Sequence, residues 1–217
     1  KIDLKGSNDP SWNSGCDGDA TTSASGGTGA YPYAWDDPSA QTTATVAGLC
    51  DGTFNVNVED ANGCQSTTSV TLTEPTVIAL STTQVNVTCN AGADGSIDLT
   101  VTGGSPTYTF AWDNSASTED IANLGQGSYE VIVTDANGCQ DSVTVTITEP
   151  PAIVLTTSAI NANCGQSDGV ISVTATGGTG SYTFAWDDPG SSVTTTVVGV
   201  SSGTYTVTVT DGNNCTQ

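Results

Sequence analysis

Gly127–Gln140 reads Gly-Ser-Tyr-Glu-Val-Ile-Val-Thr-Asp-Ala-Asn-Gly-Cys-Gln. Tyr129, Val131 and Val133 occupy every second position, and this period of two predicts a β-strand with one set of side chains on one face. Asp135–Gly138 predicts a tight turn directly after the strand, because Asn and Gly tolerate the positive φ that such turns need. This stretch is therefore expected to be a strand that leads into a turn.

The same pattern occurs twice more in the chain. Phe54–Val58 leads into Asp60–Cys64, and Tyr205–Val209 leads into Asp211–Cys215. Three of the four tryptophans recur at intervals of 77 and 74 residues, at Trp35, Trp112 and Trp186. A chain with a fixed internal period is interpreted first as tandem repeats, and units of this length can each form a small core.

The repeat boundaries are predicted at the two Glu-Pro pairs. Proline cannot donate to a β-ladder, so Pro75 and Pro150 suit junctions between units. The expected repeats are residues 1–75, 76–150 and 151–217. Ser142–Thr148 is the expected last strand of the second repeat, and the third repeat has no counterpart. That strand is therefore missing or supplied from elsewhere, by a continuation of the chain or by another chain.

The fold class follows from strands of alternating pattern separated by turn residues, with no helical pattern. It is predicted to be all-β, with three tandem immunoglobulin-like antiparallel β-sandwich repeats arranged as a rod. The aromatic residues of one strand, Tyr108, Phe110 and Trp112 in the second repeat, are expected in the core.

The charge of the chain excludes several classes of partner. Two Lys against 23 acidic residues give a net charge of −21. Such a field repels phosphate backbones and anionic lipid head groups, so no nucleic acid partner is expected. No apolar run is long enough to span a bilayer, so no membrane insertion is expected.

Six of the seven cysteines recur at two positions, and they indicate disulfides and an oxidising compartment. One set precedes the second strand of each repeat: Cys16, Cys89 and Cys164. The other set follows the penultimate strand: Cys64, Cys139 and Cys215. Pairing within each repeat is the simplest proposal. In a seven-stranded sandwich, however, these two loops lie at opposite ends, beyond the roughly 7 Å between Cα atoms that a bridge allows.

The alternative is pairing between neighbouring repeats. Cys16 would then bond with Cys139, and Cys89 with Cys215, and the sequence leaves both schemes open. Cys50 has no counterpart in the other repeats. It is a free thiol, a partner for Cys16, or a link to another chain.

Recurrent carboxylates have two interpretations. They lie at Asp19, Asp60, Asp94, Asp135, Asp168 and Asp211. Together with Asn side chains and turn carbonyls they would suit Ca²⁺, which prefers oxygen ligands. Alternatively, Asp caps turns and keeps strand edges soluble, which is the interpretation that we favour. No cofactor other than Ca²⁺ is expected.

Catalysis is not expected. The chain has no His, and no nucleophile has a neighbouring base to activate it. An exposed aromatic residue such as Trp12 or Tyr31 would instead suit a platform for a glycan.

All three repeats resemble a known family, and the resemblance is weakest over residues 1–20. The second repeat shows the motifs. Thr100–Gly104, Tyr108–Trp112, Ile121–Leu124, Gly127–Asp135 and Ala136–Cys139 are similar to the SprB repeat of Bacteroidota surface proteins. The resemblance implies an immunoglobulin-like or PKD-like module of very large cell-surface adhesins, among them gliding-motility adhesins exported by type IX secretion. It implies an extracellular location and supplies no catalytic residues.

The predicted function is therefore a structural stalk or filament segment of an extracellular surface adhesin, which provides reach and stiffness. The expected partners are neighbouring repeats of the same or another copy of the chain, and a surface glycan or protein. The alternatives are a glycan- or protein-binding module, or accessory repeats of a secreted hydrolase.

Overall fold

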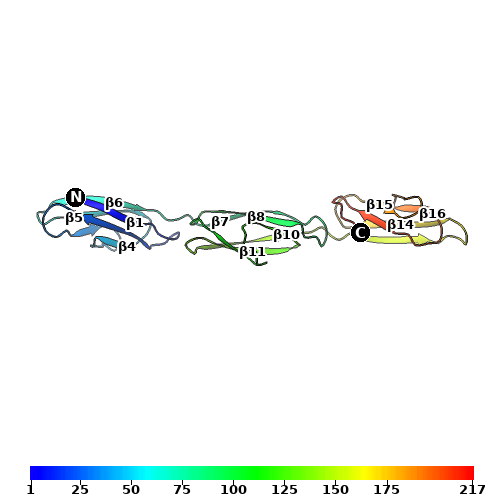
Figure 1. Cartoon of the computed structure of the whole chain (residues 1–217), viewed down its shortest axis with the longest axis horizontal. Helices are drawn as coiled ribbons and strands as arrows, with labels where there is room; N and C mark the ends of the chain where they lie inside the picture. The colour runs from blue at the N-terminus through cyan, green and yellow to red at the C-terminus, as the bar shows by residue number, and fades with distance from the viewer. The chain divides into compact units, whose positions relative to one another are not determined.

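The computed structural model describes residues 1–217, and all of its regular elements are β-strands (Figure 1). The predicted all-β class with antiparallel sheets is confirmed. No helix is long and apolar enough to cross a membrane.

The first six strands are β1 (Ile2–Asn8), β2 (Gly18–Ala24), β3 (Tyr33–Trp35), β4 (Thr45–Leu49), β5 (Gly52–Glu59) and β6 (Gln65–Leu72). The next six are β7 (Ala79–Val85), β8 (Gly95–Thr102), β9 (Thr109–Trp112), β10 (Ile121–Leu124), β11 (Gly127–Thr134) and β12 (Gln140–Ile147). The last five are β13 (Val154–Ile160), β14 (Gly169–Thr176), β15 (Thr183–Trp186), β16 (Thr196–Val200) and β17 (Val207–Thr210).

The contacts of the chain group it into two compact units. Unit 1 comprises Lys1–Ser81, Thr100–Ala111 and Val131–Val143. Unit 2 comprises Thr82–Leu99, Trp112–Glu130 and Thr144–Gln217. The first sequence repeat lies in unit 1 and the third in unit 2, while the second contributes residues to both. The boundaries expected after Pro75 and Pro150 remain a prediction.

Unit 1 contains two three-stranded antiparallel sheets of the first repeat, in the orders β1-β2-β4 and β3-β5-β6. In the second sheet, β5 pairs with β6 along an eight-residue ladder, from Gly52 opposite Leu72 to Glu59 opposite Gln65. The ends of such a ladder are roughly 24 Å apart. Gly18, at the start of β2, pairs with Leu49 and lies against Leu72. The start of β2 therefore lies at the Leu72 end of the β5–β6 ladder.

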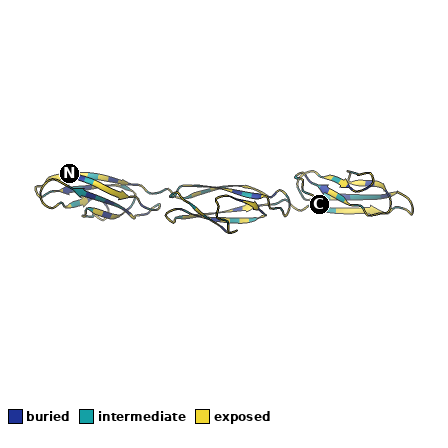
Figure 2. Ribbon diagram, viewed as in Figure 1, coloured by how far each residue is buried: buried dark blue, intermediate teal, exposed yellow.

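The core of the first repeat lies between these two sheets. Phe54, Val56 and Val58 are the buried positions of β5. Between them, Asn55 is exposed and Asn57 is half-buried. The three buried residues pack with Trp35 of β3 and with the buried residues of β4 and β6, including Leu72. Figure 2 shows the resulting alternation of buried and exposed residues along the strands.

In unit 2, the strands of the third repeat also form two antiparallel sheets, in the orders β13-β14-β16 and β15-β17. Val173, Trp186, Val197 and Val209 form its buried core together with Val200. Where the other repeats have a sixth strand, this one has an isolated bridge between Thr210 and Thr216 and a backbone hydrogen-bond pair between Val209 and Gln217, both at 3.0 Å.

The first strand of the second repeat, β7, covers Ala79–Val85 and begins inside the apolar run Val77–Leu80. Most of its residues are polar and exposed, so no alternation of apolar residues marks it. The backbone carbonyl of Thr76 instead accepts the N–H of Gly104 at 2.7 Å, before the strand begins.

Candidate functional site

Asp135 organises the turn after β11, and we call residues 135–139 the Asp loop of the second repeat. One carboxylate oxygen accepts the N–H groups of Asn137 and Cys139, each at 2.9 Å. The other accepts the N–H of Ser105 at 2.9 Å. Burial acts to raise the pKa of Asp135, but these N–H groups outweigh it and hold the pKa below its ordinary value. The ionised carboxylate is thus the centre on which the loop is built.

The same Asp loop occurs in the other two repeats, at residues 60–64 and 211–215. Asp60 and Asp211 each accept the N–H of the cysteine four residues later at 2.9 Å. They also accept the N–H of the residue two positions later, again at 2.9 Å. The turn needs a positive φ at its fourth residue, and Gly63, Gly138 and Asn214 supply it at 81°, 86° and 66°. Each Asp loop therefore holds its cysteine in the same local frame.

A second type of loop precedes the second strand of each repeat, and we call residues 11–17, 88–94 and 163–168 the cap loops. An aspartate closes each of them by accepting the N–H of the first loop residue, over distances of 2.8, 3.0 and 2.8 Å. These aspartates are Asp17, Asp94 and Asp168. Asp19, which the sequence analysis grouped with Asp94 and Asp168, lies instead in β2 and accepts a hydrogen bond from the amide of Asn8 at 2.9 Å.

The first two cap loops contain the same turn, which aligns them residue by residue. The carbonyl of Trp12 accepts the N–H of Gly15 at 2.9 Å, as the carbonyl of Cys89 accepts that of Gly92 at 3.0 Å. Trp12 therefore occupies the position of Cys89, and Cys16 lies four residues further on. The grouping of Cys16 with Cys89 in the sequence analysis is corrected by this alignment.

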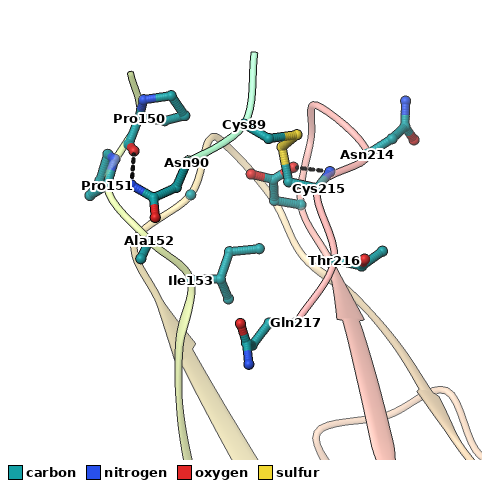
Figure 3. Close-up of a pocket in the computed structure, with 12 residues that line it drawn as sticks. Cys89, Asn90, Pro150, Pro151, Ala152, Ile153, Asn214, Cys215, Thr216 and Gln217 are labelled. Carbon is teal, nitrogen blue, oxygen red and sulfur yellow. Dashed lines mark hydrogen bonds between the residues drawn. A yellow bond between two sulfur atoms is a disulfide. The ribbon is translucent and has the colours of Figure 1, made fainter. Parts of the chain in front are cut away.

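The two Glu-Pro pairs clasp these cap loops. Glu74 accepts hydrogen bonds from the amide of Asn13 at 2.9 Å and from the N–H of Ser14. Glu149 accepts them from the amide of Asn90 at 2.8 Å and from the N–H of Ala91 at 2.6 Å. Each Asn amide also reaches the carbonyl of the following proline (Figure 3, for Asn90 and Pro150). The sequence predicts these pairs only as repeat boundaries, and nothing in it indicates the clasp.

In unit 2, a cap loop and an Asp loop from consecutive repeats are covalently joined. Cys89 forms a disulfide with Cys215 across a separation of 126 residues (Figure 3). Beside the bond, the amide of Asn213 donates to the carbonyl of Thr88 at 3.1 Å. This is the pairing of neighbours that the sequence left open for these two cysteines.

In unit 1, a cap loop and an Asp loop meet without a disulfide. The amide of Asn137 donates to the carbonyl of Ser11 and to the hydroxyl of Ser105, the latter at 2.8 Å. Trp12 occupies the cap-loop position that Cys89 occupies in unit 2, so this pair of loops has no cysteine opposite Cys139, which is a free thiol. Burial, followed by the negative charge of Asp135, raises the pKa of the Cys139 thiol.

A groove of about 420 Å³ lies at this junction in unit 1. Trp12 is 46% exposed there. The indole N–H groups of the core tryptophans donate to Thr carbonyls at 2.9–3.0 Å, whereas that of Trp12 has no acceptor in the protein. The side chains that line the groove include Trp12, Asn13, Val77, Ile78, Cys139 and Asp141.

The remaining cysteines are distributed as follows. Cys16 bonds with Cys50, which was one of the three options for Cys50. Pairing of Cys16 with Cys64 does not occur, because Cys16 adjoins the Leu72 end of the β5–β6 ladder and Cys64 the opposite end. Free thiols remain at Cys64, Cys139 and Cys164.

The carboxylates considered for Ca²⁺ lie in separate loops or strands. No group of three or more His, Cys, Asp or Glu side chains is close enough to hold a metal ion. Except for Asp19, the oxygens of these aspartates accept the backbone N–H groups that build the loops.

The family model described as the SprB repeat matches residues 81–117 and 156–191, which confirms the predicted resemblance over these two stretches. A search of curated proteins found no match.

Among solved structures, the chain is similar to three tandem-domain proteins. The Sidekick-1 immunoglobulin domains 1–5 show 9% identity and a TM-score of 0.41, covering 99% of this chain and 57% of that one. The eight N-terminal immunoglobulin domains of DSCAM show 13% identity and a TM-score of 0.39, covering 85% of this chain and 31% of that one. A tetra-tandem repeat from the extending region of a large adhesion protein shows 14% identity and a TM-score of 0.26, covering 99% of this chain and 71% of that one. Scores this low say nothing about function.

Proposed function

We propose that the chain is a non-catalytic stalk or filament segment of an extracellular surface adhesin, and that its repeats are joined through paired loops. The match to the SprB repeat supports a repeat module of a surface adhesin. The two disulfides support an oxidising, extracellular location.

One observation carries this proposal. The Asp-loop asparagine donates to a carbonyl in the cap loop of the preceding repeat, from Asn137 to Ser11 within unit 1 and from Asn213 to Thr88 within unit 2. A chain that builds the same loop pairing twice is suited to connect modules in series. Residues 1–75, 76–150 and 151–217 are the proposed modules, with the last strand of the third missing or supplied from elsewhere.

Small-angle scattering from the oxidised chain tests the proposal. A compact globule of 217 residues would have a radius of gyration of roughly 17 Å. Three modules, each about one eight-residue strand or roughly 27 Å long, would give at least about 80 Å end to end and a clearly larger radius. A radius near the globular value would refute the stalk.

The groove at Trp12 favours a second candidate function, the binding of a glycan. A half-exposed indole ring suits stacking on a sugar, and its free N–H and the neighbouring Asp141 offer hydrogen bonds. Binding to a glycan array that is lost on Trp12→Ala and retained on Trp112→Phe would support it. Equal binding by Trp12→Ala would exclude this groove.

A further inference from the structure

Two of the free thiols lie in the two kinds of loop that a disulfide joins elsewhere in the chain. Cys64 belongs to the Asp loop of the first repeat, Cys164 to the cap loop of the third, and both are exposed. In unit 2, a cap-loop cysteine bonds with the Asp-loop cysteine of the following repeat, as Cys89 does with Cys215. Cys164 and Cys64 are therefore the two halves of the same type of bond, and neither is bonded within residues 1–217.

The Asp loop of the first repeat also has an unused hydrogen-bond donor. A side-chain amide carries two N–H donors. Asn137 gives one to Ser105 at 2.8 Å and the other to the cap-loop carbonyl of Ser11. Asn62 gives one to the hydroxyl of Thr28 at 2.7 Å, in the same way, but its second has no acceptor in the protein. A cap loop placed against Cys64 would supply that acceptor.

The cap loop of the third repeat is built to take the same role, although it is one residue shorter. Asn163 donates its N–H to Asp168 as Thr88 does to Asp94. Its turn begins at Asn163 rather than at the cysteine, since the carbonyl of Asn163 accepts the N–H of Gln166 at 2.9 Å. Cys164 consequently lies within the turn at the exposed tip of the loop, and the carbonyl of Asn163 keeps a second lone pair for a donor.

We propose that Cys164 of one copy of the chain forms a disulfide with Cys64 of a second copy, through the loop pairing seen between Cys89 and Cys215. This goes beyond the proposed stalk and does not depend on it. The contact is heterologous, because two different surfaces meet, so it leaves one thiol of each kind free on the dimer and permits growth head to tail.

The oxidant in this step is a small disulfide such as oxidised glutathione. The Cys164 thiolate attacks it, forms a mixed disulfide and releases one glutathione thiolate. The Cys64 thiolate of the second copy then attacks the sulfur of Cys164, forms the protein disulfide and releases the second glutathione. The two protein thiols lose two protons and two electrons, and the oxidised glutathione becomes two reduced molecules.

Cys139 is not expected to compete in this reaction. It is half-buried beside Trp12 and its pKa is raised, so fewer thiolates form and they are harder to reach. The net charge of −21 on each copy opposes the approach of two copies. Salt near 1 M shortens the screening length to about 3 Å and should speed the reaction.

The test uses the full chain in a Cys139→Ser background with two further variants, Cys64→Ser and Cys164→Ser. Each is incubated alone and mixed with the other in oxidised glutathione and 1 M salt, then separated on non-reducing gels. The mixture should give a disulfide-linked dimer, and neither variant alone should give more than a tenth of its yield. Mass spectrometry should identify Cys64 joined to Cys164. The chain with both thiols should give a ladder with steps of 21.7 kDa.

Equal dimer yields from single variants and mixture, or no dimer in the mixture, would overturn the proposal. The Asn62→Ala variant tests whether dimer formation depends on pairing of the two loops or only on the reactivity of the two thiols. It should slow dimer formation several-fold and leave the reaction of Cys64 with a small thiol reagent unchanged. Unchanged dimer formation would show that the loops do not pair as proposed.

Discussion

Trp12 takes the place in the first cap loop that Cys89 takes in the second. Both carbonyls accept the N–H of the glycine three residues later, and both loops are clasped by the glutamate of a Glu-Pro pair. Each residue also faces an Asp loop, in one case with a disulfide and in the other with a free thiol. The two junctions therefore share a loop frame and differ in whether it is locked covalently.

Trp12→Cys should convert the unlocked junction into a locked one. The new thiol would lie opposite Cys139, as Cys89 lies opposite Cys215, and the two should oxidise to a disulfide. In the entropic model, closing a loop of this size stabilises the chain by up to about 5 kcal/mol, although engineered bonds usually achieve less. The number of titratable thiols in the denatured, oxidised chain should fall from three to two.

The matched control is Trp12→Cys combined with Cys139→Ser. It loses the same indole ring but cannot form the bond, and it should show two free thiols at Cys64 and Cys164 besides the new one. If the single variant keeps four free thiols and melts like the control, the two cap loops are not equivalent.

Asp135→Asn should destabilise the Asp loop of the second repeat. The side-chain oxygen can still accept one or two of the N–H groups, but the new NH₂ group would face a donor from Ser105 or Cys139. Loss of a charged acceptor at a buried site costs about 2 kcal/mol. Chemical unfolding should show it, and Asp98→Asn, an exposed strand position that also removes one charge, should change stability by less than about 0.5 kcal/mol.

A strand could be predicted from the sequence where burial of one face makes apolar and polar residues alternate. A strand with no buried face could not. β11 follows from Tyr129, Val131 and Val133, of which the two valines are fully buried. β7 does not, because its residues are mostly polar and exposed. Alternation reports burial of one face, so an edge strand without a buried face gives no signal.

In the first repeat, the cysteine does not lie at the same loop position as in the second, so residue type alone misleads. Asp17-Gly18 corresponds to Asp94-Gly95, which places Trp12, and not Cys16, at the position of Cys89. Aligning the aspartate-glycine pairs would have found this. The pairing of Cys16 with Cys50 depends on β4 returning beside β2, from Gly18 opposite Leu49, and that is a tertiary contact.

Stability should fall steeply with acid only below about pH 4. Asp60, Asp94 and Asp135 have folded-state pKa values that are lowered from 3.8. The Thr88 hydroxyl and then its N–H stabilise the ionised form of Asp94. Burial opposes the shift at Asp135, but backbone N–H groups outweigh it there, and backbone N–H groups also lower the pKa of Asp60. A lowered folded pKa stabilises the fold above the unfolded pKa, and this contribution is lost as pH falls through the folded value. Between pH 7 and 5 the melting temperature should stay constant or rise, because protonation of other acidic side chains reduces the repulsion between negative charges. A steady fall from pH 7 downward would contradict this sign.

Chelation of metal should leave the melting temperature unchanged. The carboxylates of Asp60, Asp135 and Asp211 accept backbone N–H groups, and no group of three acidic or thiol side chains gathers. Thermal melts in EDTA and in 5 mM CaCl₂ should agree to within about 1 °C at constant ionic strength. A rise with Ca²⁺ that MgCl₂ fails to reproduce would indicate a specific site between the loops.

The disulfides should control how far the chain extends under tension. Cys89–Cys215 and Cys16–Cys50 remove 126 and 34 residues from the 217 that could extend, which leaves 57. At about 3.5 Å per residue, the oxidised chain should reach roughly 200 Å and the reduced chain roughly 760 Å when pulled from its ends in an optical trap.

Cys89→Ser, kept oxidised, separates the two bonds. It should add roughly 440 Å to the extension of the oxidised chain, because only the 126-residue loop is released. Cys139→Ser removes a thiol that is not bonded and should leave the extension at roughly 200 Å. If oxidised and reduced chains extend equally, the bond at the junction does not carry load. A locked junction would protect residues 90–214 from unfolding by force, because the load would pass directly from Cys89 to Cys215.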